Sequence, residues 1–369
     1  MRIEQAKKQM PVMDLLRKSY TESQPFKGVK VGVCMHITKE TAILLMTLKD
    51  GGAEVLACAS NPLSTQDDVA SALLDYGVAI FYAKKGMTDE EYKQGLWAVA
   101  SQRPDYIIDD GGDLTTLMHE IGAPYPKGGL EETTTGVNRI KTMQLEYPII
   151  AVNDADTKHL FDNVYGTGQS TLDGIIRATN TLLAGKTFVV AGYGNCGKGL
   201  AMRAKGMGCN VIVTEIDPIK ALQATMDGFR VMTMCKAVGE GDIFVTVTGS
   251  KNVINREHLL IIKPNAILAN AGHFDVEIDA KSAKEFGMNL LAEGRLVNLA
   301  CAEGHPAEVM DMSFANQAMG LKYLIENNLG KGVHNIPKSI DTTIAVFKLK
   351  TLGIEIDEET EEQINYKKS

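Results

Sequence analysis

The sequence predicts an α/β protein with two doubly wound parallel-sheet domains, the second of them a Rossmann-type cofactor domain. Short apolar runs alternate with helical segments over residues 1–160. Strand, helix and strand in repeated succession indicate a parallel sheet covered by helices on both faces. A glycine-rich turn between an apolar run and a helix begins a second such series near residue 185. The length of 369 residues suits two hydrophobic cores.

The first half of the chain supplies the first sheet. Beginning with a strand, strands and helices are expected in alternation at 29–36, 40–52, 53–60, 68–77, 78–83, 89–100 and 105–113. Ligands of such sheets bind beyond the carboxyl ends of the strands. His36, Asn61 and Asp110 follow three of the expected strands and are therefore candidates for a binding site, although polar residues there also cap helices.

The second half begins with strand, turn, helix and strand over residues 185–217. Further short strands are expected at 242–249 and 266–272, and a helix is expected at 313–329. The charged segment 353–369 is expected to be a terminal helix or partly disordered.

The turn in this second unit has the spacing G-x-G-x-x-G. Gly192 permits the tight turn, Gly194 lets the backbone approach a pyrophosphate, and Gly197 allows the helix to pack closely on the strand. Glu215 ends the next strand about 20 residues further on, where a carboxylate accepts hydrogen bonds from a ribose and repels a 2′-phosphate. The pattern favours NAD over NADP. The alternative is a glycine turn without a ligand, and the unit alone is typical of a plain dehydrogenase.

Composition and charge disfavour several classes of partner. The net charge of −8 argues against a nucleic-acid or anionic-membrane surface, where clustered Lys and Arg are expected. The N-terminus MRIEQAKKQM is polar, and no apolar run approaches the roughly 18 residues of a spanning helix. Six scattered cysteines without a C-x-x-C pair favour a reducing cytoplasm, free thiols and no metal site.

Four further stretches are rich in groups that act on sugars, at 34–41, 109–113, 131–136 and 153–163. Asp109 and its neighbours precede two glycines, which suits either a ligand site or a turn with solvated acids. For Asp109 we favour the solvated turn. Three consecutive threonines at 133–135 either line a pocket with hydroxyls or simply favour extended backbone.

Nine motifs resemble the S-adenosylhomocysteine hydrolase family and occur in its order, from about residue 10 to 365. They are CMHITKETA, NPLSTQDD, IIDDGGDLT, EETTTGV, NDADTKHLFDN, VVAGYGNCGKG, AGHFDVEID, LLAEGRLVNLACAEGHP and MSFANQ. The resemblance implies a substrate-binding domain at 1–165 plus 306–345, an NAD-binding domain at 166–305 and a tail at 346–369. It also implies a homotetramer.

The implied reaction is the reversible hydrolysis of S-adenosyl-L-homocysteine to adenosine and L-homocysteine. The ribose 3′-hydroxyl is oxidised by tightly bound NAD, the thiol is eliminated, water adds, and the hydride returns. The family's catalytic groups would be His36, Asp110, Glu132, Lys158, Asp162, Asn163 and His273. The nucleoside thioether would also meet Thr38, Glu40, Gln66 and the backbone around His305. NAD would be held by Thr133, Thr134, Thr135, Asn163, Gly192, Gly194, Asn195, Gly197, Glu215 and Asn298.

The resemblance also assigns roles within this set. Lys158 would be the base at the 3′-hydroxyl, which requires a depressed pKa or a proton relay. Glu132 would bind the ribose hydroxyls. His36 and Asp110 would manage protons at C4′ and at the sulfur or water, with His273 near the homocysteine side.

Some alternatives remain open. Some relatives act on S-inosyl-L-homocysteine, but the carboxylate of Glu40 suits the adenine amino group, so we expect the adenosyl substrate. The chain ends at YKKS, where some relatives have a longer tail that reaches the cofactor of a neighbouring protomer. A plain NAD dehydrogenase and a catalytically silent NAD-binding homologue are the two further hypotheses.

Overall fold

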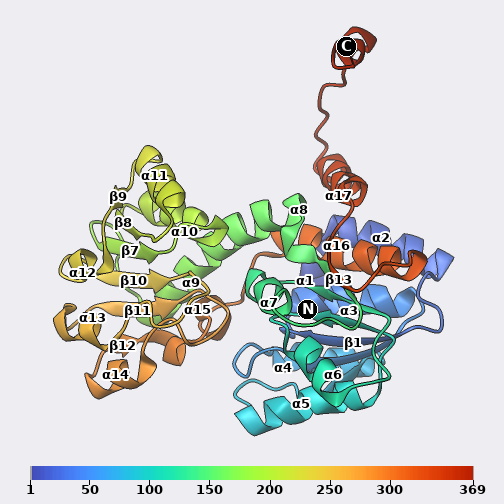
Figure 1. The fold of residues 1–369 in the computed structure, drawn as a ribbon, viewed down its shortest axis with the longest axis horizontal. Coiled ribbons are helices and arrows are strands. Elements are labelled where there is room, and N and C mark those ends of the chain that lie inside the picture. The colour runs from blue at the N-terminus through green and yellow to red at the C-terminus, as the bar shows by residue number, and fades with distance from the viewer. Residues whose placement is uncertain (1, 369) are drawn as a thin grey trace.

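The computed structural model describes residues 2–368, which form two parallel sheets flanked by helices (Figure 1). The first sheet has seven strands in the order β13-β6-β5-β4-β1-β2-β3. Its strands are β1 (Lys30–Met35), β2 (Glu54–Ala59), β3 (Ala79–Phe81), β4 (Tyr106–Asp109), β5 (Gly128–Glu131), β6 (Pro148–Ala151) and β13 (Gly332–Asn335). Every pair within it is parallel, so the carboxyl ends of all seven strands lie at one edge.

The second sheet has six strands in the order β12-β11-β10-β7-β8-β9, and all its pairs are also parallel. Its strands are β7 (Thr187–Ala191), β8 (Asn210–Thr214), β9 (Arg230–Val231), β10 (Ile243–Thr246), β11 (Ile267–Asn270) and β12 (Asn289–Leu290). The first strand of this half, β7, lies in the middle of the sheet, and later strands are added on both sides of it, as in a Rossmann fold. The glycine-rich turn directly follows β7.

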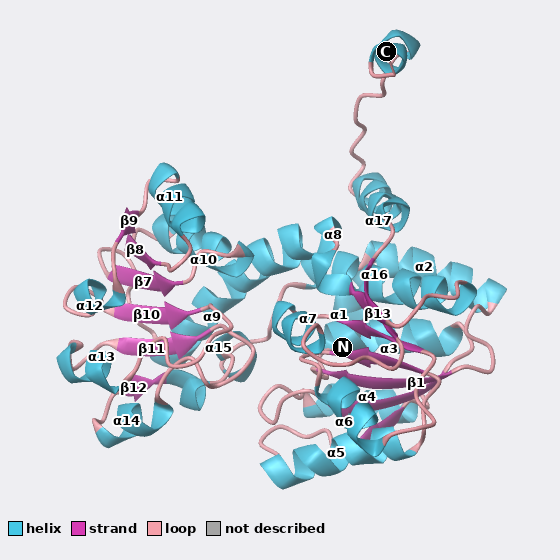
Figure 2. Cartoon of the chain, viewed as in Figure 1, coloured by secondary structure: helices cyan, strands magenta, loops and turns pink. Residues whose placement is uncertain are grey.

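Both sheets are covered on two faces (Figure 2). In β1, Val31 and Val33 enter one core while Cys34 enters another. In β7, Phe188 and Val189 likewise enter separate cores. Since successive strand residues point to opposite faces, each sheet separates two cores, as the apolar runs predicted.

Helices connect and cover the strands. Around the first sheet they are α1 (Arg2–Gln9), α2 (Pro11–Ser23), α3 (Lys39–Asp50), α4 (Asp67–Asp75), α5 (Asp89–Ser101), α6 (Asp113–Ile121), α7 (Thr134–Ile140), α16 (Ala307–Glu326) and α17 (Lys338–Thr351). Around the second sheet they are α10 (Asn195–Gly206), α11 (Pro218–Met226), α12 (Met234–Ala237), α13 (Arg256–Ile261), α14 (Ala280–Glu285) and α15 (Val297–Ala300). Short 3₁₀ turns lie at Val152–Asp154 and Leu291–Gly294.

The chain passes from the first sheet to the second along one nearly continuous helical segment (Figure 1). It consists of α8 (Asp156–Lys158), a π-helix (His159–Gly166) and α9 (Thr167–Thr179). The segment packs on α10 so closely that a Cβ at Gly199 would lie 1.8 Å from the carbonyl oxygen of Val164. A glycine is therefore required at that position.

The predicted strands and helices of both halves are present, and most have bounds within a few residues of those expected, whereas α16 begins at Ala307, ahead of the expected 313–329. Strands β5, β6, β9, β12 and β13 were not among the expectations. β13 returns to the edge of the first sheet beside β6, and the exact domain bounds stay a prediction. The tail contains a short helix, α18 (Glu361–Tyr366), which extends away from both sheets (Figure 1). Among residues 2–368, none of the helices combines the length and the apolar character that a membrane crossing requires.

Candidate active site

A cavity of about 1480 Å³ lies where the carboxyl ends of the two sheets meet. It brings together eighteen of the predicted residues: His36, Thr38, Glu40, Asp110, Glu132, Thr133, Thr134, Thr135, Lys158, Asp162, Asn163, Gly192, Gly194, Asn195, Glu215, His273, Asn298 and His305. Gln66 and Gly197 are not in its wall. A cavity of this size accommodates a dinucleotide and a second small molecule together.

Lys158 lies at the centre of a buried polar cluster. Its Nζ is 2.9 Å from Oδ1 of Asn163 and 3.3 Å from Oδ2 of Asp162. Oδ1 of Asn153 and Oε1 of Glu132 lie 3.4 and 3.6 Å away. The side chain of Lys158 is only 5% exposed, so these partners replace water around the ammonium group.

The charges of this cluster determine its protonation. Burial lowers the pKa of Lys158, but the charges of Asp162 and Glu132 raise it above its ordinary value. Burial raises the pKa of Asp162, while Lys158 and His305 bring it below the usual range. Burial, opposed by Lys158, raises the pKa of Glu132 to about 8. Lys158 is therefore an ammonium here, and of the two routes expected for a lysine base, a depressed pKa is not the one present.

The π-helix explains how both Asp162 and Asn163 reach Lys158. In an α-helix the residue at i+4 faces residue i, whereas a π-turn brings the residue at i+5 onto the same face. The π-helix begins directly after Lys158. Asp162, at i+4, and Asn163, at i+5, therefore both contact its ammonium group. π-segments often occur at functional sites.

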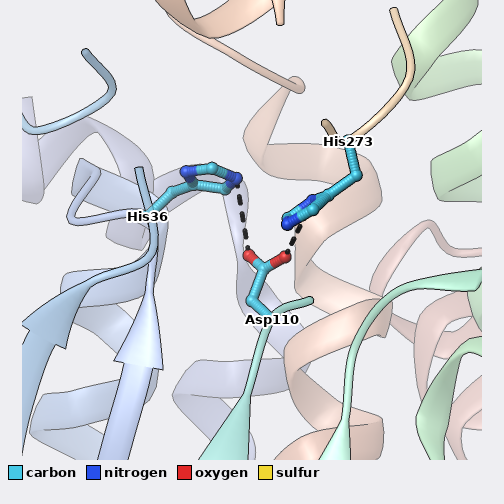
Figure 3. A group of neighbouring side chains, drawn as sticks. All are labelled: His36, Asp110 and His273. Carbon is cyan, nitrogen blue, oxygen red and sulfur yellow. Dashed lines mark ion pairs between the residues drawn. The ribbon is translucent and has the colours of Figure 1, made fainter. Parts of the chain in front are cut away.

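A second cluster joins the two sheets. Asp110 follows β4 of the first sheet, and its carboxylate lies between two imidazoles (Figure 3). Nε2 of His36 is 3.6 Å from Oδ2, and Nδ1 of His273, which follows β11 of the second sheet, is 3.7 Å from Oδ1. The three ligand-type atoms lie within 4.8 Å of one another. The expectation that the protein binds no metal stays a prediction.

The hydrogen bonds of His36 depend on its tautomer. Its Nδ1 is 2.7 Å from Oγ of Ser64, which also lies 3.2 Å from the carbonyl oxygen of Asn61. When the hydroxyl donates to Asn61, Nδ1 carries the ring hydrogen and Nε2 has the lone pair. Burial lowers the pKa of His36 to about 4, assisted by the charges of His273 and His305 and opposed by Asp110. His36 is therefore a neutral base at physiological pH.

Gly111 makes the approach of His273 possible. A Cβ at this position would lie 2.2 Å from Nε2 of His273, and the backbone φ of +109° also favours glycine. The Gly-Gly of the DDGGD motif therefore admits a side chain from the second sheet to Asp110.

Two buried carboxylates anchor the segments that follow β4 and β5. Asp109 is fully buried and accepts hydrogen bonds from the backbone N–H groups of Asp110 and Thr115. The interpretation of Asp109 as part of a solvated turn is therefore wrong, because the acid serves as an internal anchor. Oε1 of Glu131 accepts from the N–H groups of Gly111 and Thr133 and so ties the two adjacent strand ends together.

The glycine-rich turn has the form that a bound dinucleotide requires. A Cβ at Gly194 would meet nothing within 4 Å, so the cavity is open where the backbone would approach a pyrophosphate. Gly194 is also the N-cap of helix α10 and provides no side-chain cap, so the first N–H groups of this helix are available to an anion. A Cβ at Gly197 would lie 2.1 Å from the carbonyl of Gly192, as expected of the packing glycine. Glu215 lines the cavity and accepts a hydrogen bond from the N–H of Tyr193.

The predicted nucleobase residues lie at the start of α3. Thr38 caps this helix by accepting from the N–H of Thr41, and Glu40 is 2% exposed in its first turn. Gln66 does not line the cavity, and its Oε1 accepts a hydrogen bond from the backbone N–H of Lys39 at the start of α3. Its predicted contact with a base stays a prediction, and the structure places it as a support of α3.

Three side chains that were not predicted contact the predicted residues directly. Asn153 bridges Thr134, Lys158 and Asn163, Gln317 donates to Glu132, and Ser313 donates to Asp162. Two further carboxylates bind neighbouring backbone instead: Asp341 accepts from the first turn of α8, and Glu277 accepts from the loop after β10. Asn153 and Glu277 lie within recognised motifs, and Ser313 and Gln317 both lie in MSFANQ, but no spacing rule indicated their contacts.

His305 has a contact that differs from the expected backbone role. Its Nδ1 pairs with Oδ1 of Asp162, and its Nε2 is 3.3 Å from Oγ1 of Thr167. The imidazole thus joins the segment that leaves the second sheet to the π-helix that carries the Lys158 partners.

Comparisons with known proteins agree with this arrangement. Residues 1–127 match the family model described as S-adenosyl-L-homocysteine hydrolase, and residues 163–290 match the model of its NAD binding domain. An adenosylhomocysteinase of Aquifex aeolicus is 54% identical, with 99% of this chain and 94% of the relative covered. An S-inosyl-L-homocysteine hydrolase of Methanocaldococcus jannaschii is 53% identical, with 99% and 94% covered. An adenosylhomocysteinase of Archaeoglobus fulgidus is 52% identical, with 99% and 97% covered.

Solved structures of lower identity share the fold. A dipicolinate synthase chain of Bacillus halodurans aligns with a TM-score of 0.51 at 14% identity, over 80% of this chain and 98% of that one. NAD⁺-bound 3-phosphoglycerate dehydrogenase of Entamoeba histolytica aligns with a TM-score of 0.50 at 14% identity, over 82% and 96%. The family models and whole-chain relatives, joined to the geometry of the cavity, identify this chain as a member of the S-adenosyl-L-homocysteine hydrolase family, with that family's NAD-binding domain.

Proposed function

We propose that this protein catalyses the reversible hydrolysis of S-adenosyl-L-homocysteine to adenosine and L-homocysteine, with NAD as a recycled cofactor. The observation that carries the proposal is the cavity in which a dinucleotide turn faces a buried lysine and a histidine–carboxylate cluster. A plain dehydrogenase would need the dinucleotide turn and the lysine, but it would not need a second acid–base cluster supplied from both sheets.

The residues present fit NAD. The open N-terminus of α10, the bare backbone at Gly194 and the carboxylate of Glu215 suit a pyrophosphate and an adenosine ribose. Thr133, Thr134 and Asn298 line the same cavity and would hold the nicotinamide end. When bound, NAD supplies a reversible hydride acceptor for the ribose 3′-carbon, which acidifies the neighbouring C4′ proton.

Lys158 and Glu132 are placed to manage the 3′-hydroxyl proton by relay. Lys158 is held as an ammonium by Asp162 and Glu132, so it accepts a proton only after releasing its own. Glu132 lies beside it, with Oε1 3.6 Å from Nζ. Its pKa is raised to about 8, which makes it a more basic carboxylate than Asp162, whose pKa is lowered.

His36, Asp110 and His273 are placed for the second half of the reaction. In the tautomer with the ring hydrogen on Nδ1, neutral His36 has a lone pair on Nε2 and can take a proton from carbon or water. Asp110 lies next to both imidazoles and can orient them or carry a proton between them.

The test uses the condensation direction. Purified protein is incubated with homocysteine and either adenosine or inosine, and thioether formation is quantified by mass spectrometry. Thioether from adenosine, without stoichiometric NADH release, supports the proposal. Free NADH that accumulates with turnover would indicate a plain dehydrogenase, and no product from either nucleoside with NAD bound would indicate a silent homologue.

We also propose that the protein is a cytoplasmic homotetramer. Support comes from the family resemblance and from apolar side chains left exposed on the π-helix, Leu160, Phe161 and Tyr165. Light scattering that gives the mass of one chain would contradict the tetramer.

A further inference from the structure

Arg139 lies in the wall of the cavity, near the end of α7. It follows Thr135 at a spacing of four residues, so both side chains lie on the face of this helix that lines the cavity. Nη1 of Arg139 donates to Oδ1 of Asp113 at 2.5 Å and to the carbonyl oxygen of Gly111 at 3.3 Å. The hydroxyl of Tyr92 donates to the other carboxylate oxygen of Asp113. The guanidinium group is therefore anchored to the segment that follows β4.

These contacts leave one edge of the guanidinium group available. Arginine presents its N–H donors in a planar fork. Both hydrogen bonds of Arg139 use Nη1, and within residues 2–368 no group accepts from its Nε or Nη2. Nε and Nη2 form the edge that binds a carboxylate through a pair of parallel hydrogen bonds. The side chain is 36% exposed and lines the cavity, so a ligand there can reach this edge.

Gly111 lies between Arg139 and the cluster that contains Asp110 and His273 (Figure 3). The carbonyl oxygen of Gly111 accepts from Arg139. Its Cα faces the imidazole of His273, since a Cβ there would lie 2.2 Å from Nε2. Under the proposed function, Asp110 and His273 lie at the sulfur of the thioether. A cation with unused donors is therefore held beside the position of the sulfur.

The amino-acid end of the thioether is the part of the substrate that the residues described so far leave without a partner. It carries an α-carboxylate, which a short aliphatic chain joins to the sulfur. Burial of an ionised carboxylate without a partner costs a large free energy, because its hydration is lost. A basic side chain is therefore expected in the cavity wall near the sulfur.

Arg139 is the basic side chain best placed to pair with this carboxylate. The other lysines and arginines in the wall are Lys158, Lys198, Lys220 and Lys251. Lys158 is already enclosed by carboxylates, and Lys198 and Lys220 lie on α10 and α11, on the side of the dinucleotide turn. Lys251 follows β10 in the second half of the chain and is the alternative partner.

We propose that Arg139 binds the α-carboxylate of the homocysteine part of the substrate and so determines specificity for an amino-acid thiol. The inference rests on the proposed function for the position of the sulfur. Asp113 and the carbonyl oxygen of Gly111 orient the guanidinium group, and its Nε–Nη2 edge binds the carboxylate oxygens. A thiol without the carboxylate lacks this interaction and is bound less tightly.

The proposal predicts a change in the ratio of two affinities. One ligand is the 3′-deoxy form of the nucleoside–homocysteine thioether, and the other has a 3-aminopropyl group in place of its amino-acid group, so that only the carboxylate is missing. Arg139→Met removes the donors, so the affinity for the first ligand should fall about tenfold or more while that for the second changes little. Arg139→Lys keeps the charge but not the fork and should retain part of the preference.

The measurement uses 3′-deoxy ligands because bound NAD cannot oxidise them. Both are prepared with adenine and with hypoxanthine, and the base that the wild type binds more tightly is used. Calorimetry gives their affinities for NAD-loaded wild type, Arg139→Met, Arg139→Lys and Lys251→Met. Lys251→Met is the matched control, because Lys251 also lines the cavity but lies in the other half of the chain. A bound-NAD assay and a melting curve establish that each variant is folded and loaded.

The ratio separates carboxylate binding from a structural role of Arg139. Loss of its support for the segment after β4 would weaken both ligands equally. A selective loss of the carboxylate ligand in Arg139→Met, absent from Lys251→Met, supports the proposal. Equal losses of both ligands, an unchanged ratio, or a selective loss in Lys251→Met alone overturns it.

The outcomes also separate this proposal from the proposed function. Thioether formation is scored separately on the wild type, so its absence counts against the proposed function while the affinity ratio still decides the role of Arg139. A wild type that binds none of the ligands would contradict both.

Discussion

The carboxylate of Asp341, on α17, binds the start of the helix that carries Lys158. Its oxygens accept hydrogen bonds from the backbone N–H groups of Asp156 and Thr157 and from the hydroxyl of Thr157. Asn316, on α16, donates to the same hydroxyl. The position of the Lys158 ammonium group therefore depends on a carboxylate more than 180 residues further along the chain.

Removal of this carboxylate should affect both stability and turnover. Asp341→Ala leaves the N–H groups of α8 without a partner, and we expect it to lower the free energy of unfolding by about 1–3 kcal/mol. It should also lower kcat, because Lys158 is no longer held. Denaturant unfolding and condensation kinetics measure the two effects. Asp279→Ala, which removes the comparable cap of α14 away from the cavity, should affect stability only; equal kcat in both variants would refute a link between Asp341 and the site.

Lys158→Met should abolish turnover while NAD stays bound. The substitution keeps the length of the side chain but removes its proton-carrying nitrogen, and loss of one acid–base group typically costs 10²–10⁴-fold in rate, by the order of magnitude known for enzymes. Thioether formation and NAD content after gel filtration give the two readouts. Activity within a few fold of the wild type would show that Lys158 is not the group that handles the hydroxyl proton.

Gly111→Ala should block the approach of His273 to Asp110. The new methyl group would lie 2.2 Å from Nε2 of His273, so this imidazole must move away from its present position beside Asp110. We expect a fall in kcat of about 100-fold or more, since a displacement near 1 Å has effects of this order. Gly28→Ala is the matched control, because its φ of +77° imposes similar backbone strain while its Cβ meets nothing within 4 Å. If both variants lose activity equally, backbone strain and not the clash is responsible.

The burial of neutral His36 should make stability depend on pH. The pKa of His36 is lowered to about 4, whereas an unfolded chain has a histidine pKa near 6.5. Between these values the unfolded chain binds more protons at this residue, so its contribution to stability is full above about pH 6.5 and is lost as pH falls toward 4. His36→Gln lacks this dependence. The difference in unfolding free energy between the two proteins should change by about 3 kcal/mol from pH 7 to pH 4, and a constant difference would contradict a neutral buried imidazole.

The sequence predicted those parts of the site that depend on local patterns. His36 and Asp110 were expected at strand ends, and the turn from Gly192 to Gly197 was expected to face a ligand, because parallel strands and glycine spacing have fixed geometry. The prediction for Asp109 was wrong because its burial depends on strands from elsewhere in the chain. The two glycines that follow it indicate a turn but do not show whether that turn is exposed.

Long-range contacts could not be predicted in the same way. The pairs Lys39–Glu303 and Asp341–Thr157 join residues 264 and 184 positions apart, and no periodicity links them. The π-helix was also not expected, because His159–Gly166 has an ordinary helical composition. Its presence follows from the demands of packing on α10 and of the polar cluster around Lys158.

That π-helix also sets the rotational phase between the two halves of the molecule. A residue in a π-turn rotates the chain by less than the roughly 100° of an α-helical residue, so the number and type of turns between α8 and α9 set the direction in which α9 enters the second half. A change in that direction would rotate the dinucleotide turn relative to His36 and Asp110, although every hydrogen bond within each sheet remained intact. The irregular helical segment thus acts as an angular spacer that aligns two separate sheets around one cavity.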